Sequence, residues 1–287
     1  MPSNFQYKKN APLSVLMSTY QNDNPLFLYL ALKSIIDQTT QPEELILVID
    51  GPIKPTHEQV IKKIKNEKLS FNLKIIRLER NQGLAGALNA GLSECKSPYT
   101  ARMDSDDICY PTRFEKQWSF LFKNPKIDIL SSWHSEFEND FEQTVFIKKT
   151  PFSHHKIIQK LKWRNVISHP TIIFRTHCVQ KIGGYSTTIG LLEDYDLYMR
   201  LIKSGSRFAS IQEPLVKVRI SSSQRIRRGG FNYVLKEWKF RFKYYKNKNY
   251  SLLEFLFISS AYTIFRLIPQ RLKLILYNVV RNSPFSE

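Results

Sequence analysis

Short apolar segments alternate with amphipathic segments along the first half of the chain. Residues 45–49 are apolar at every position, as in a strand that is buried on both faces of a sheet. Leu28, Leu32 and Ile35 recur at helical spacing. Strands are expected at 13–18, 45–49, 73–78 and 99–103, and helices at 26–38, 58–68 and 84–93. This alternation predicts an α/β fold with one Rossmann-like sheet, mixed but mostly parallel and flanked by helices.

The second half of the chain is less regular and ends in a basic, aromatic segment. Helices are expected at 111–123, 154–164 and 193–204, and strands at 127–132, 144–148 and 171–175. Residues 217–248 then contain eleven basic side chains and one acidic side chain, interleaved with aromatic residues. We therefore expect a principal domain over 1–230 and a helical, basic and aromatic tail over 231–287.

The overall charge favours an anionic partner. The 287 residues include 43 basic and 25 acidic side chains, which gives a formal net charge of +18. The three cysteines have no metal or redox spacing, and an odd count fits a reducing compartment. Neither a signal peptide nor an apolar run long enough to span a membrane is recognisable. We therefore expect a cytoplasmic protein.

Three carboxylates lie within four positions, directly after the strand expected at 99–103. They are Asp104, Asp106 and Asp107. Ligands of open α/β sheets bind at the carboxyl ends of the strands, and carboxylates this crowded repel one another unless a cation is present. Mg²⁺ and similar ions are commonly held by one or two carboxylates together with substrate phosphates. The cluster predicts a divalent metal, Mg²⁺ or Mn²⁺, with a phosphorylated substrate, although an isolated Asp-x-Asp often serves as a turn or a helix cap.

Other polar positions suggest how the rest of such a site would be built. Asp50 ends an expected strand, where its carboxylate could accept hydrogen bonds from a base or a ribose, or simply form a turn. Arg80–Gly83 precede an expected helix, whose free N–H groups would favour anions. Glu193 and Asp194 begin another helix, where acids commonly complement the helix dipole. A carboxylate apart from the metal could instead take a proton from an attacking hydroxyl.

Taken together, these segments resemble family 2 glycosyltransferases, which are inverting enzymes with the nucleotide-sugar "A" fold. The resemblance covers roughly residues 12–230. It is carried by residues 13–20 (LSVLMSTY), the Asp50-Gly51 turn, residues 102–117 (RMDSDDICYPTRFEKQ) and residues 193–200 (EDYDLYMR). His169-Pro170-Thr171 and residues 225–230 are similar to the bacterial subgroup that assembles surface and extracellular polysaccharides.

The resemblance implies a role for each matching position. Asp194 would be the catalytic base, Asp106 would bind the metal, and Asp104 would face the ribose. Glu193 and His169 would lie on the acceptor side. The remaining nucleotide-binding positions would be Thr19, Tyr20, Asp50, Arg80, Asn81 and Gly83. The family often has two acids before this glycine and a serine after it, whereas this chain has Ile49-Asp50-Gly51-Pro52. The implied donor is a nucleotide-diphosphate sugar, with UDP the usual nucleotide, and the implied acceptor is a lipid-linked saccharide.

The tail and the overall function each leave alternatives. The basic and aromatic tail could lie on an anionic membrane, bind nucleic acid, or form an ordinary solvated helix. We expect membrane association on the cytoplasmic face of the inner membrane, and no nucleic-acid partner. The alternatives to a glycosyltransferase are another metal-dependent nucleotide enzyme, such as a nucleotidyltransferase, and a basic nucleic-acid-binding protein. No Walker-type or dinucleotide-binding glycine motif follows the first expected strand.

Overall fold

The protein is described by a computed structural model, which covers residues 10–221 and 230–268. Its strands are β1 (Asn10–Thr19), β2 (Gln41–Ile49), β3 (Asn72–Arg77), β4 (Tyr99–Met103), β5 (Ile108–Cys109), β6 (Ile129–Phe137), β7 (Phe146–Lys148), β8 (Ile173–Arg175) and β9 (Phe208–Arg219). Its α-helices are α1 (Pro25–Ile36), α2 (Pro55–Lys65), α3 (Gly83–Leu92), α4 (Arg113–Lys123), α5 (His154–Leu161), α6 (Thr176–Lys181), α7 (Glu193–Lys203), α9 (Phe231–Lys246) and α10 (Leu252–Leu267). A short 3-10 helix, η1 (His169–Thr171), precedes β8.

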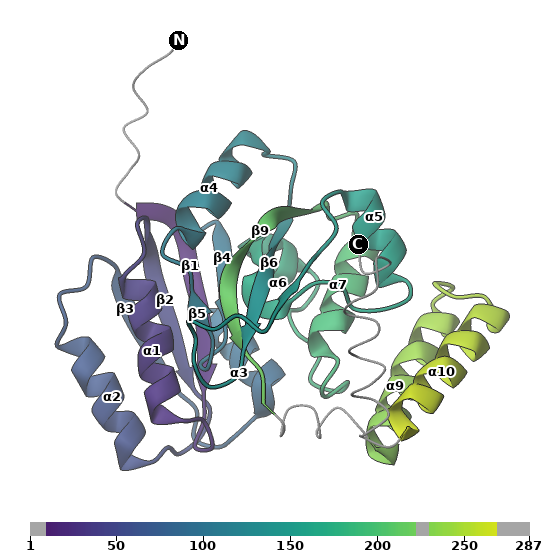
Figure 1. Cartoon of the computed structure of the whole chain (residues 1–287), viewed down its shortest axis with the longest axis horizontal. Helices are drawn as coiled ribbons and strands as arrows, with labels where there is room; N and C mark the ends of the chain where they lie inside the picture. Colours follow the sequence, from purple (N-terminus) through teal and green to yellow (C-terminus); the bar gives the residue numbers. More distant parts are fainter. Residues whose placement is uncertain (1–9, 222–229, 269–287) are drawn as a thin grey trace, which may run out of the picture.

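The strands of the described residues form one mixed sheet, as the sequence predicted (Figure 1). The strand order is β3-β2-β1-β4-β8-β6-β9-β5, and β7 pairs with β6. Strands β1 to β4 pair in parallel, whereas β8 pairs antiparallel with both β4 and β6. Because β1, β2 and β4 run in the same direction, the residues that follow them lie at one edge of the sheet. Thr19, at the end of β1, is therefore brought close to Asp50 and Asp104, which follow β2 and β4, at the carboxyl ends of these strands.

Helices cover both faces of the sheet because successive side chains of a buried strand point to opposite sides. In β1, Leu13, Val15 and Met17 belong to an apolar cluster with residues of α1, α2 and α4. Leu16, on the other face, joins a second cluster with residues of α3, α5, α6 and α7. The fully apolar pattern of the central strands follows from this double coverage.

The strand β9 was not predicted from the sequence. It pairs in parallel with β6 and in antiparallel with β5, another strand that the sequence did not indicate. Pro214 lies in the middle of β9, and proline normally excludes a segment from the interior of a sheet because it has no N–H to donate. The pairing register shifts at the Trp133–Pro214 pair, so this irregularity accommodates the proline.

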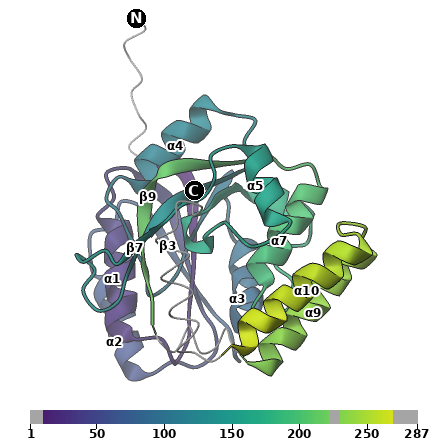
Figure 2. The same ribbon diagram turned by 45° about the vertical axis from the view of Figure 1, so that its right-hand side comes forward.

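Within the described part of the expected tail, the helices α9 and α10 lie beside each other next to α7 (Figure 2). The ring of Phe240 lies 4.7 Å from that of Tyr195 on α7, measured between centroids. The Lys243 ammonium and the Tyr244 hydroxyl both bind the Asp196 carboxylate, at 2.6 and 2.7 Å. This part of the tail thus shares a core with the preceding residues, while the domain boundary at residue 230 stays a prediction.

Parts of two other predicted features lie outside the described residues. These are residues 225–229 of the basic segment and the end of the apolar tail beyond residue 268. Across residues 10–221 and 230–268, no helix has both the length and the apolar composition that a membrane span needs.

Candidate functional site

The three acids that follow β4 converge on one point. Asp104, Asp106 and Asp107 each place a carboxylate oxygen within 4.8 Å of the others. Asp107 is buried, and its Oδ1 accepts a 2.8 Å hydrogen bond from the backbone N–H of Arg219 at the end of β9. Its Oδ2 is also buried but has no hydrogen-bond partner in the described part of the chain. An unpartnered buried carboxylate oxygen beside two further carboxylates fits a cation-binding site.

The electrostatics of the cluster support the same interpretation. Burial, followed by the nearby Asp104 and Asp23 carboxylates, raises the pKa of Asp106 to about 7. Burial and the two neighbouring acids also raise the pKa of Asp107 well above its ordinary value. Both groups therefore resist ionisation in the absence of a positive charge. A divalent cation would remove this cost, so the residues fit the metal that the sequence predicted.

Arg102 provides a fixed positive charge next to the acids. Its side chain is almost fully buried and forms an ion pair with Asp104. A buried guanidinium needs an anionic partner because its desolvation is otherwise too costly. This pair orients the Asp104 carboxylate. No role for Arg102 was predicted from the sequence.

The loop after β1 is tied to the acid cluster by Asp23, which the sequence analysis also did not single out. The Oδ2 atom of Asp23 accepts hydrogen bonds from the Ser105 hydroxyl at 2.7 Å and the Thr19 hydroxyl at 3.0 Å. It also accepts one from the Tyr20 backbone N–H at 3.3 Å. The predicted nucleotide-binding positions Thr19 and Tyr20 are thus held next to the turn that carries the acids.

Asp50 fixes the loop that precedes α3. Its Oδ1 accepts a 2.7 Å hydrogen bond from the Gln82 N–H, and its carbonyl accepts one from the Asn81 side chain at 3.2 Å. Gly51 has a φ of +83°, and a Cβ there would lie 2.6 Å from the Asn81 nitrogen, so only glycine fits. The buried Asp50 carboxylate therefore positions the segment with Arg80, Asn81 and Gly83, and contact with a base stays a prediction.

The second acidic group opens α7. Asp194 is partly exposed, and its Oδ2 accepts a 2.8 Å hydrogen bond from the side chain of Asn165. Glu193 is buried, and burial followed by the adjacent Asp194 raises its pKa to about 7. The charges of Asp104 and Arg102 also act on the pKa of Glu193. The acids after β4 and the acids of α7 are therefore close enough to interact electrostatically.

His169 lies close enough to Arg102 to be affected by its charge. Its Nε2 lies 2.9 Å from the Tyr185 hydroxyl, and the side chain is largely buried. Burial, followed by the Arg102 charge, holds the pKa of His169 well below its usual value, so the ring is neutral at pH 7. The backbone N–H of Tyr185 donates a 2.7 Å hydrogen bond to the side-chain oxygen of Asn89 on α3. Contact between His169 and the acceptor stays a prediction.

Comparisons with known proteins identify the family of the chain. A family model described as "Glycosyl transferase family 2" matches residues 14–181. The chain is 36% identical to an Escherichia coli UDP-Gal:alpha-D-GlcNAc-diphosphoundecaprenol beta-1,3-galactosyltransferase, over 93% of this chain and 95% of the relative. It is also 36% identical to an amylovoran biosynthesis glycosyltransferase of Erwinia amylovora, over 78% of this chain and 82% of the relative.

A solved structure supports the fold. The mannosyltransferase PcManGT from Pyrobaculum calidifontis, in complex with GDP-Man and Mn²⁺, matches with a TM-score of 0.62. The match covers 96% of this chain and 77% of that chain, at 14% identity. At that identity the likeness shows a shared fold and leaves the substrates of this chain open.

Proposed function

Because the chain belongs to glycosyl transferase family 2 and is therefore a glycosyltransferase, we propose that it transfers a sugar from a UDP-sugar, with inversion, to a hydroxyl of a lipid-linked saccharide. Family membership sets aside the nucleotidyltransferase alternative. The observation that carries the proposal is that the Asp104–Asp107 cluster and the first turn of α7 lie close enough for the Asp104 and Arg102 charges to act on the pKa of Glu193.

The donor half of the site is assigned to the carboxyl ends of β1, β2 and β4. Asp106 and its neighbours Asp104 and Asp107 would hold Mg²⁺ or Mn²⁺, and Asp104 would also face the ribose. Such an ion neutralises the charge of a departing diphosphate. The loop held by Asp23 and the loop held by Asp50 would border the nucleotide.

The acceptor half is assigned to the first turn of α7. The Asp194 carboxylate would remove the proton from the acceptor hydroxyl as that oxygen attacks the anomeric carbon of the donor sugar. Its hydrogen bond from Asn165 fixes one oxygen, which leaves the orientation of the group defined before substrate arrives. A single displacement of this kind inverts the anomeric configuration. Oxocarbenium character develops in its transition state, as in glycoside hydrolysis.

The relatives support the choice of substrates. One has a name that specifies UDP-Gal and a GlcNAc-diphosphoundecaprenol acceptor, and another is named for amylovoran biosynthesis. For this chain we propose a UDP-sugar donor, a sugar diphospholipid acceptor and a place in surface polysaccharide assembly. A basic chain with a net charge of +18 suits two substrates that both carry a diphosphate.

A panel of nucleotide sugars tests the proposed donor. The purified chain should gain thermal stability with Mn²⁺ and one or more UDP-sugars, because a ligand that binds only the folded state stabilises it by mass action. The corresponding GDP- and TDP-sugars are the controls. Slow hydrolysis of the same UDP-sugar, measured as UDP release, should accompany the shift. Stabilisation by a GDP-sugar alone would overturn the assignment of uridine.

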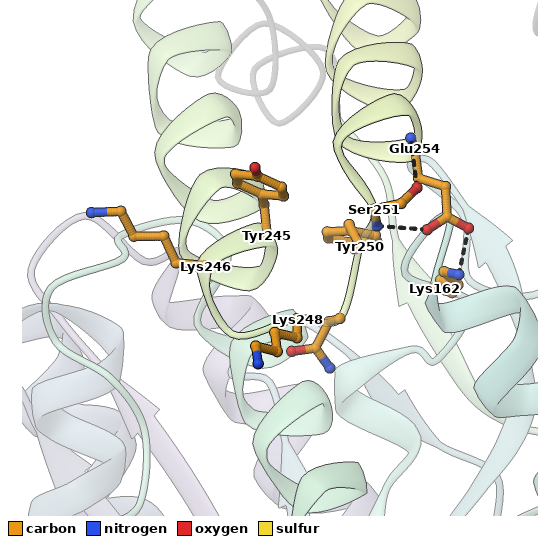
Figure 3. A pocket seen from close by; sticks show the side chains of 8 residues that line it. Lys162, Tyr245, Lys246, Lys248, Tyr250, Ser251 and Glu254 are labelled. Carbon is orange, nitrogen blue, oxygen red and sulfur yellow. Dashed lines mark hydrogen bonds and ion pairs between the residues drawn. The ribbon is translucent and has the colours of Figure 1, made fainter.

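We also propose that α9 and α10 dock on an anionic membrane. Leu253 and Phe257 on α10 are 79% and 69% exposed, although both are large and apolar. A hollow of about 580 Å³ at the turn between the helices is lined by Lys246 and Lys248, whereas Lys162 there is paired with Glu254 (Figure 3). Exposed apolar groups next to lysines suit a surface of anionic lipids. This docking would bring the site to a lipid-linked acceptor.

Vesicle co-sedimentation tests the docking. The chain should sediment with phosphatidylglycerol-containing vesicles and much less with phosphatidylcholine vesicles, and salt should weaken the binding. Leu253→Glu/Phe257→Glu should lower the bound fraction about 10-fold or more, because each buried apolar side chain contributes about 1.5–3 kcal/mol. Val145→Glu/Phe152→Glu is the matched control, since these residues are also exposed but belong to the segments that precede β7 and α5. Equal losses in both variants would refute the assigned surface.

A further inference from the structure

A second hollow lies beside the start of α7, between the preceding loop and α9. Its volume is about 460 Å³. The loop contributes Thr187, Thr188 and the backbone near Gly190, and α9 contributes Lys236, Lys239 and Lys243. The three lysines recur at i, i+3 and i+7 and therefore share one side of the helix. None of the residues assigned above to the donor half of the site lines this hollow.

The hollow carries an uncompensated positive charge. Lys236 and Lys239 form no ion pair with any residue in the described part of the chain, and both side chains are exposed. Lys243 is paired with Asp196, but that carboxylate also binds Arg200 at 2.7 Å, so it serves two cations. Lysine ammonium groups bind phosphate as compact point charges, and threonine hydroxyls can add hydrogen bonds. The chemistry of this lining suits a phosphate ester.

The loop that lines the hollow continues into the turn that leads to the proposed base. The Gly190 carbonyl accepts hydrogen bonds from the N–H groups of Leu192, at 2.8 Å, and Glu193, at 3.2 Å. The loop that lines the hollow therefore folds directly into the first turn of α7, where Asp194 follows. In a sugar diphospholipid, the diphosphate is attached to the same sugar whose hydroxyl would approach Asp194. Its negative charge must then lie within one sugar ring of the base.

We propose that Lys236 and Lys239 bind the diphosphate of the lipid-linked acceptor. This assignment rests on the proposed function and specifies how the acceptor is recognised. Lys243 positions α9 against α7 through Asp196 and adds charge at the inner end of the hollow. Phe231 and Leu235, on the same helix, are 65% and 45% exposed and provide apolar surface for the lipid chain. The loop and α9 thus form a diphosphate site next to the turn that leads to the base.

Acceptors that differ only in the diphosphate test the assignment. Transfer is measured to a sugar diphosphate that carries an alkyl chain and to the neutral alkyl glycoside of the same sugar. In Lys236→Gln/Lys239→Gln, kcat/KM for the diphosphate acceptor should fall about 10- to 100-fold, the range for lost charge-assisted contacts. The value for the neutral glycoside, and the KM for the donor, should not change. Lys236→Arg/Lys239→Arg should retain most of the activity because it keeps both charges.

The control removes the same charge elsewhere. Lys62→Gln/Lys65→Gln changes two exposed lysines of α2, which packs on the opposite face of the sheet, and should leave transfer to both acceptors unchanged. An equal loss with the two acceptors, or an undiminished rate with the diphosphate acceptor in Lys236→Gln/Lys239→Gln, would overturn the assignment.

A binding measurement separates this proposal from the proposed function. Calorimetry with geranyl diphosphate in EDTA needs neither donor, metal nor turnover. Wild type and the α2 control should bind this probe at least about 10-fold more tightly than Lys236→Gln/Lys239→Gln. Inorganic pyrophosphate should bind more weakly than geranyl diphosphate, and equal binding would indicate a site for free anions and overturn the lipid assignment. A wild-type chain that binds the probe through these lysines but transfers no sugar would contradict the proposed function alone.

Discussion

Asp194→Asn should lower kcat by about 10²- to 10⁴-fold, the usual contribution of a positioned general base. Asparagine keeps the shape of the side chain but cannot accept the acceptor proton. The new amide can accept the hydrogen bond from Asn165 with its carbonyl oxygen, and its NH2 group then replaces Oδ1, which accepts a 2.7 Å hydrogen bond from the Tyr195 N–H. Donor affinity should therefore stay unchanged, because the acids that hold the nucleotide diphosphate follow β4 and not α7. Transfer at saturating donor and calorimetry with the UDP-sugar and Mn²⁺ measure the two quantities.

Glu193→Gln is the matched control, because it makes the same chemical change one residue earlier. Glu193 is buried and its pKa is raised to about 7 by burial and by Asp194. A carboxyl with such a pKa is suited to proton transfer near neutral pH, so Glu193 is also the strongest rival for the base. We expect Glu193→Gln to retain most of the transfer activity. Near-normal kcat in Asp194→Asn together with a large loss in Glu193→Gln would assign the base to Glu193.

The parallel half of the fold could be predicted because its signals are local. Alternating apolar strands and amphipathic helices specified β1 to β4 and the helices between them, and each predicted range overlaps the observed element. The antiparallel half was harder to predict. Strand β9 contains Pro214, and a proline argues against a strand because it has no N–H to donate. The register shift that accommodates it occurs opposite Trp133 in β6, which is far away in the sequence. Strand β5 has only two residues and pairs with β9, so it could not be predicted without β9.

The acids of the candidate site were recognisable, but the residues that support them were not. Asp104 and Asp106 stand out as a dense cluster, whereas Asp23 contacts Ser105 from 82 positions away. Arg102 reads as one basic residue inside an apolar strand, and only burial identifies it as the partner of Asp104. His169 was expected on the acceptor side, and its burial against Tyr185 could not be inferred from neighbours in the sequence.

The relation of the tail to the rest of the chain also depends on long-range contacts. The sequence indicated a basic and aromatic helix after residue 230 and favoured a membrane-associating segment. In the structure, Lys243 and Tyr244 of α9 bind Asp196, which lies two residues after the proposed base. The tail helix therefore supports the helix that carries Asp194. Changes in α9 should be examined for effects on transfer as well as on membrane binding.

Asp106→Asn should abolish most of the metal-dependent gain in donor affinity. Removing one carboxylate from a three-acid site leaves fewer anionic ligands for a divalent cation, which is bound mainly by charge. In calorimetry with the UDP-sugar, wild type should bind more tightly with Mn²⁺ than with EDTA. The variant should show little difference between the two conditions. Asp37→Ala, at the exposed end of α1, removes a carboxylate elsewhere and should behave as wild type.

The same variant should not lower the stability of the metal-free protein, which distinguishes a ligand from a structural residue. The crowded acids repel one another, and Asp106 is one source of the charge that acts on Asp107. Replacing it with a neutral amide relieves this repulsion, so the melting temperature in EDTA should be equal to or higher than that of wild type. Added Mn²⁺ should raise the melting temperature of wild type only, because stabilisation by a ligand requires binding to the folded state. A large drop in EDTA would show that Asp106 is needed for folding, and an undiminished Mn²⁺ shift would remove it from the metal site.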